Sequence, residues 1–211
     1  MCYDRKDIML QILRKIFSRG ASRDAAFKNI LCAVPDTRQS ANYSCGAAAL
    51  QAVLRYWGID IEEDKLMNLL KTSPDYGTNE KDIVRVARRM GLKARFKDNV
   101  TLEDLERSIH EGIPVIVDCQ SWRSSRQSNK SWANDWKNGH YMVVIGIDED
   151  NVYLEDPYVL GSRGYIPRQE FEERWHNPGG TPPSYDERQY HLGIFIEGER
   201  PSTSGELVRI H

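Results

Sequence analysis

Cysteine is scarce in this sequence of 211 residues, and its four cysteines lie far apart: Cys2, Cys32, Cys45 and Cys119. The chain therefore lacks the closely spaced pairs that indicate a disulfide framework. A structural zinc site usually places its ligands in pairs a few residues apart, and neither the cysteines nor the five histidines show such spacing. We expect no metal site and no other cofactor.

Long apolar runs and an excess of charge are also absent. No segment approaches about 18 consecutive apolar residues, the length that predicts a transmembrane helix, and the N-terminus lacks the apolar core and cleavage site of a signal peptide. The 29 basic and 31 acidic side chains nearly balance, so no global positive surface points to nucleic acid. We expect a soluble cytoplasmic protein that has no transmembrane segment and no nucleic-acid partner.

The first thirty residues differ from the rest in charge, because they hold seven Lys or Arg against three Asp. Within them, residues 4–17 place Ile8, Ile12 and Ile16 on one stripe, which predicts an amphipathic helix. Such a helix can dock on a partner protein or on an anionic membrane surface, or it can pack its stripe on its own domain. The sequence leaves these alternatives open.

The segment around Cys45 has the features of a nucleophile site. Cys45 opens an alanine-rich helical pattern, and the N–H groups and partial positive charge of a helix N-terminus favour a thiolate. Attack of a thiolate on an amide creates an oxyanion, which needs donors such as a backbone N–H and a side-chain amide. Gln39, six residues before Cys45, can supply that amide. Taken alone, Cys45 could equally be a small buried apolar residue.

A candidate base and a candidate acid follow later in the chain. His140 begins a β-branched apolar run, Asp156 ends a second run, and the polar segment 148–151 between them predicts a hairpin turn. The start of the first strand and the end of the second then meet, so we expect His140 and Asp156 to lie close together. Glu155 is the rival acid, but strand alternation points it to the opposite face. With Cys45, these residues predict a Cys–His–acid constellation.

The chain resembles the papain-like cysteine peptidases that trim double-glycine leaders from bacteriocin precursors. The resemblance covers roughly residues 34–196 and rests on Gln39, Cys45-Gly46-Ala47-Ala48, Tyr56-Trp57-Gly58, residues 86–92, Pro114-Val115-Ile116-Val117, residues 139–144 and Asp156-Pro157. It implies that Gln39 is an oxyanion donor, Cys45 the nucleophile, His140 the general base and Asp156 its acid. It also implies a peptide or protein substrate.

The same resemblance sets the expected domain organisation. The peptidase domain is expected at residues 31–198, between an N-terminal extension at 1–30 and a C-terminal tail at 199–211. The best-known members of the family are fused to a membrane transporter. No transporter sequence follows here, so we expect a stand-alone peptidase-like domain.

The order of the predicted elements indicates the α+β class, because helical patterns come first and strands later. The expected helices are 45–57, 62–71, 80–90, 102–111 and 168–175, and the expected strands are 113–118, 140–147, 152–155 and 190–197. With the resemblance, they predict a papain-like cysteine peptidase fold. Its helical lobe, with a central Cys-bearing helix, would pack against an antiparallel β-sheet lobe and leave a cleft between the two.

Two further segments are ambiguous. Residues 120–139 form a polar connection that is long for a compact domain and leads directly to His140. Its Trp132 and Trp136 are weak candidates for substrate binding, the alternative being that they pack on the body of the domain. Gly179-Gly180 looks like the cleavage dipeptide of the family's substrates, but beside prolines it is more simply a loop.

We therefore expect a cysteine peptidase that hydrolyses a peptide or amide bond. Two alternatives stay open. An amine or thiol acceptor in place of water would make the same site an acyl or peptidyl transferase. A domain without turnover would only bind a peptide. The sequence does not indicate the substrate.

Overall fold

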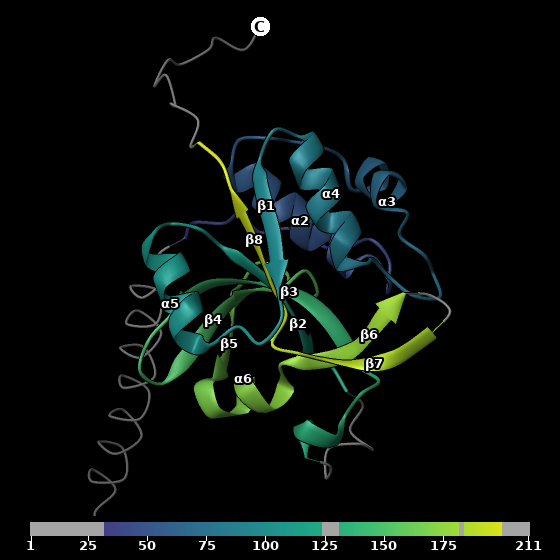
Figure 1. Cartoon of the computed structure of the whole chain (residues 1–211). Helices are drawn as coiled ribbons and strands as arrows, with labels where there is room; N and C mark the ends of the chain where they lie inside the picture. The colour runs from purple at the N-terminus through teal and green to yellow at the C-terminus, as the bar shows by residue number, and fades with distance from the viewer. Residues whose placement is uncertain (1–31, 124–130, 182–183, 200–211) are drawn as a thin grey trace, which may run out of the picture.

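The structure is a computed structural model that describes residues 32–123, 131–181 and 184–199 (Figure 1). The helix expected at residues 4–17, and the tail from residue 200 onward, lie outside the described residues. No described helix is both long enough and apolar enough to cross a membrane.

The described chain contains the four helices expected in its first half: α2 (Cys45–Tyr56), α3 (Glu63–Leu70), α4 (Glu80–Arg89) and α5 (Leu102–His110). A strand that was not expected, β1 (Lys93–Lys97), lies between α4 and α5. Local capping explains the starts of two of these helices. The Asn79 side chain accepts a hydrogen bond from the main chain of Lys81 at the start of α4, and Thr101 and Asp104 form a capping box at the start of α5. In Figure 1, α2, α3 and α4 are gathered together and form the helical part of the molecule.

The helix α2 is the buried centre of this helical part. Its residues from Gly46 to Leu54 are all buried, and the helix packs against the sheet through small alanine side chains. At Gly46 the approach is closest, since a Cβ there would lie 2.8 Å from Thr78 Cβ and 3.1 Å from Tyr141 Cδ2. The absence of a side chain at Gly46 thus lets the first turn of α2 lie directly against the sheet.

The sheet has six antiparallel strands in the order β1-β8-β2-β3-β4-β5. Their bounds are β1 (Lys93–Lys97), β2 (Val115–Gln120), β3 (Gly139–Ile147), β4 (Asn151–Glu155), β5 (Gly164–Pro167) and β8 (Gly193–Glu197). The expected α+β fold, with its Cys-bearing helix on an antiparallel sheet, is confirmed. The edge strands β1 and β5 were not expected, because they have only five and four residues and few apolar side chains, so their local signal is weak. Helix α6 (Arg168–Arg174), expected at residues 168–175, follows β5.

A two-stranded ribbon, β6 (His176–Thr181) and β7 (Ser184–Tyr190), corrects one prediction. The loop reading of Gly179-Gly180 was wrong, because Gly179 lies in β6 and pairs with Glu187. Local propensity disfavours a strand here, but tertiary contacts hold the ribbon against β2. The Gln120 side-chain amide donates to the main-chain oxygen of His176 at 2.9 Å. The ribbon therefore borders the sheet beside the start of β3.

Candidate active site

Cys45 is the first residue of α2 and is half-buried. No acidic side chain lies in the first turn of this helix, so the N-terminal end of the helix dipole faces the cysteine without local negative compensation. The turn before it is closed by Ser44, whose hydroxyl donates to the main-chain oxygen of Ala41 at 3.0 Å. The thiol is therefore presented at a helix end that favours negative charge.

His140 and Asp156 meet as the predicted hairpin requires. Strands β3 and β4 pair antiparallel, and His140 Nε2 lies 2.6 Å from Asp156 Oδ1. The main-chain N–H of Tyr158 donates to the same carboxylate oxygen at 2.8 Å. Because Asp156 engages Nε2, the other ring nitrogen, Nδ1, is the one left for a second partner.

Cys45 is that second partner of His140. Burial alone disfavours a charged imidazole, but hydrogen bonds to Asp156 and Cys45 outweigh it and raise the pKa of His140 to about 10. The structure thus brings the three predicted residues together in the order thiol, imidazole, carboxylate. This arrangement can hold a thiolate–imidazolium pair.

Gln39 lies beside the segment that follows Asp156. Its main-chain N–H donates to the Pro157 oxygen at 3.0 Å, and its Nε2 donates to the Ala41 oxygen at 2.8 Å. Its Oε1 is buried without a hydrogen-bond partner among the described residues. Gln39 is therefore anchored between the turn that precedes Cys45 and the segment that follows Asp156. Among the described contacts, none joins its amide directly to Cys45.

Glu155, the rival acid, points elsewhere. Its side chain is fully buried, accepts from the main chain of Thr37 at 2.8 Å and forms an ion pair with Arg163. Burial raises the pKa of Glu155 to about 7. The acid that contacts His140 is Asp156, as strand alternation indicated.

Trp122, which belongs to the same loop as the candidates Trp132 and Trp136, contacts Asp156. Its indole N–H donates to Asp156 Oδ2 at 3.0 Å, and its ring packs on Tyr158 with centroids 4.7 Å apart. The tryptophan remains 55% exposed and has a left-handed backbone, φ 56°. It therefore covers the carboxylate from the solvent side. No sequence pattern reveals this, since the contact joins residues 34 positions apart.

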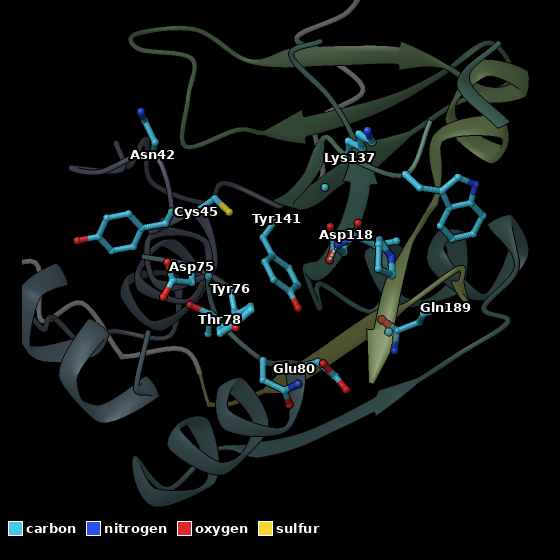
Figure 2. A pocket seen from close by; sticks show the side chains of 18 of the residues that line it. Asn42, Cys45, Asp75, Tyr76, Thr78, Glu80, Asp118, Lys137, Tyr141 and Gln189 are labelled. Atoms are coloured by element: carbon cyan, nitrogen blue, oxygen red, sulfur yellow. Dashed lines mark hydrogen bonds between the residues drawn. The ribbon is translucent and has the colours of Figure 1, made fainter. Parts of the chain in front are cut away.

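A pocket of about 520 Å³ opens next to Cys45 (Figure 2). Its walls come from the loop before α2, the segment that leads into α4, strand β2 and the ribbon; they include Asn42, Tyr76, Thr78, Glu80, Asp118, Tyr141 and Gln189. Trp136, a weak candidate for substrate binding, also lines this pocket and packs on His176. The pocket offers space for a ligand group directly beside the nucleophile candidate.

Trp132, the other weak candidate, lines a neighbouring pocket of about 660 Å³ that Asp156 also borders. The guanidinium groups of Arg123 and Arg174 lie 3.6 and 3.7 Å from its ring centroid. Trp132 is thus held by cation–π contacts, and the pocket that it lines does not include Cys45.

Asp118 is a residue that sequence reasoning missed. It lies in β2 opposite Tyr141, is only 5% exposed, and accepts from Asn177 Nδ2 at 2.6 Å. Burial raises the pKa of Asp118 to about 6, against the opposing effects of Asn177 and His140. Asp118 follows an apolar strand pattern, and nothing in the sequence around it indicates that it lines the pocket. Among the described residues, no group of three His, Cys, Asp or Glu could hold a metal ion.

A cysteine at the start of a central helix, facing a histidine and an aspartate on an antiparallel sheet, is the architecture of the papain-like peptidase fold. Residues 31–182 match the Peptidase_C39 like family, and the chain belongs to this family. Over 132 residues, 62% of this chain, the sequence is 30% identical to the transport/processing ATP-binding protein ComA of Streptococcus pneumoniae. The match spans only 16% of that protein's length.

Solved structures share the fold. A putative C39-like peptidase from Bacillus anthracis superposes with a TM-score of 0.61 at 21% identity, over 82% of this chain and 98% of the other. A double-glycine motif protease from an AMS/PCAT transporter, solved in complex with its leader peptide, gives a TM-score of 0.54 at 20% identity, over 79% and 92% of the two chains. These likenesses agree with the family membership at the level of the fold.

Proposed function

We propose that the protein is a cysteine peptidase that hydrolyses a peptide or amide bond with Cys45, His140 and Asp156. The observation that carries the proposal is the position of His140, which is hydrogen-bonded to Asp156 through Nε2 and contacts Cys45 with its remaining edge. The raised pKa of His140 supports an imidazolium that stabilises a neighbouring thiolate. The family membership agrees with this chemistry.

The proposed reaction follows from these positions. His140 takes the proton of Cys45, and Asp156 keeps the imidazolium oriented through its short hydrogen bond. The thiolate attacks the carbonyl carbon, and the backbone N–H of Cys45 donates to the oxyanion together with an N–H of the Gln39 amide. His140 then protonates the leaving amine, and water, deprotonated by His140, releases the acyl group.

The proposed substrate is a peptide segment that binds across the opening beside Cys45. Support comes from the pocket, which is open to a ligand group, and from a relative of the same fold that was solved with a leader peptide. Trp136 lies on the wall of that pocket and offers an aromatic contact.

Site-resolved alkylation by iodoacetamide tests the nucleophile. Near about pH 5–6 an ordinary thiol, with a pKa of about 8.5, is protonated and reacts slowly. We expect Cys45 to react rapidly there and His140→Ala to abolish that reactivity. The buried Cys32 and Cys119 are internal references, and burial raises the pKa of Cys119 well above its ordinary value. If Cys45 reacts no faster than an ordinary thiol in this range, the peptidase proposal fails and a peptide-binding role replaces it.

A further inference from the structure

The pocket beside Cys45 is predominantly acidic. Three carboxylates line it, Asp75, Glu80 and Asp118, against one lysine among the described residues, Lys137. Asp75 and Lys137 are exposed, whereas Glu80 and Asp118 are buried, at 9% and 5% exposure. Figure 2 shows Lys137 and Glu80 at opposite ends of the pocket. The buried part of the wall therefore carries the negative charge.

One carboxylate oxygen of Asp118 has no hydrogen bond of ordinary geometry among the described residues, although the main-chain N–H of His140 acts on the carboxyl and opposes the rise of its pKa. This oxygen is the buried Oδ1, whereas Oδ2 accepts from Asn177. Buried carboxylate oxygens are normally satisfied, because an unpaired one costs the full desolvation of the group. Because Asp118 lines the pocket, a ligand bound there is placed to supply a donor to this carboxylate.

Glu80 adds a second negative charge to the same wall. Burial raises the pKa of Glu80, and the charge of Glu80 contributes to the raised pKa of Asp118. Among the described residues, neither carboxylate forms an ion pair with a lysine or arginine. A cation near both groups would offset their desolvation penalty and their mutual repulsion.

The position of this wall relates it to the nucleophile. Asp118 is paired with Tyr141 in the sheet, and the ring of Tyr141 lies close to Gly46, the residue after Cys45. In Figure 2 the side chain of Tyr141 lies between those of Cys45 and Asp118. We propose that Asp118, together with Glu80, forms a subsite that accepts the cationic side chain of a lysine or arginine near the scissile bond of the substrate. This inference rests on the peptidase function proposed above and names a feature of its substrate.

Peptidyl acyloxymethyl ketones, which alkylate a catalytic thiol after binding as a peptide, test the subsite. The two probes of a pair are identical except at one residue, which is lysine in one probe and norleucine in the other. A separate pair is made for each residue position of the peptide. Norleucine keeps the apolar stem but lacks the ammonium group. The rate of Cys45 labelling is measured by mass spectrometry in the wild type, in Asp118→Asn and in Glu149→Gln. The last variant removes an exposed carboxylate in the turn between β3 and β4 and is the charge-matched control.

We expect the lysine probe to react at least about tenfold faster than norleucine at one position, as one charged hydrogen bond implies. Asp118→Asn should remove most of this preference, and Glu149→Gln should keep it. No preference in the wild type, or a preference that survives Asp118→Asn, overturns the subsite. Asp118 also lies near enough to interact with the charge of His140. If Asp118→Asn slows both probes equally, Asp118 acts through His140 and the subsite is likewise refuted.

Two further results separate this inference from the peptidase proposal. If no probe labels Cys45 faster than a free thiol, the peptidase proposal itself fails and the subsite falls with it. If Cys45 is labelled rapidly but without regard to charge, only the subsite fails. If Asp118→Asn does not fold, the same labelling rates are measured in Glu80→Gln. We expect this variant to lose a smaller part of the preference for lysine.

Discussion

The role of Asp156 can be tested by Asp156→Asn, which keeps the size of the side chain and removes its charge. The carboxylate is 4% exposed and lies 2.6 Å from His140 Nε2, so solvent screens the pair little. A hydrogen bond to a charged group is worth about 1.5–3 kcal/mol. At 1.36 kcal/mol for each pKa unit, its loss lowers the pKa of His140 by about one to two. The thiolate–imidazolium pair becomes less favourable by the same free energy.

The expected result is a loss of about tenfold or more in the rate at which iodoacetamide alkylates Cys45 near pH 5–6. The assay measures the rate from pH 4 to 10 and resolves each thiol by mass spectrometry. Glu155→Gln is the matched control, since this neighbouring acid is buried but bonded to Thr37 and Arg163. A profile that moves in Glu155→Gln and stays unchanged in Asp156→Asn would refute the assignment of the acid.

Three further predictions follow from single contacts. Trp122→Phe keeps a ring against Tyr158 but loses the indole hydrogen bond to Asp156, so we expect labelling of Cys45 to slow by a factor of about 2–10 with little change in Tm; a Tm loss of many degrees would contradict this. Gly46→Ala places a Cβ 2.8 Å from Thr78 and should destabilise the fold by about 1–3 kcal/mol in urea unfolding, whereas Gly164→Ala, with contacts of 3.8 Å, should be nearly neutral. Burial raises the pKa of Asp118 to about 6 from its ordinary value of 3.8, so the folded state binds the proton more tightly and this group lowers stability as pH rises from about 4 to 6. The free energy of unfolding of Asp118→Asn should therefore rise relative to that of the wild type over that interval, by at most about 3 kcal/mol. If the difference between the two proteins is the same at pH 4 and at pH 7, the burial argument is contradicted.

The elements that sequence reasoning found are those with strong local signals. The helix that begins at Cys45 has an alanine-rich pattern and ends before a glycine, and α5 has a capping box, so local chemistry alone defines them. The central strands β2 and β3 each contain an apolar run, at residues 115–117 and 141–147. The strands that were missed or misread, β1, β5 and the β6–β7 ribbon, are polar, short or glycine-rich and depend on neighbouring strands for their hydrogen bonds.

The same division holds at the site. The polar turn between the two strands determined that His140 and Asp156 could meet, because a hairpin brings its two open ends together. Their contact with Cys45, which begins a separate helix, depended on how that helix packs on the sheet. Trp122 on the Asp156 carboxylate, Asp118 in the pocket wall and the contact between the ribbon and β2 were decided only by the tertiary structure. These contacts join segments many residues apart, and no periodicity along a single sequence records which distant surfaces will pack against each other.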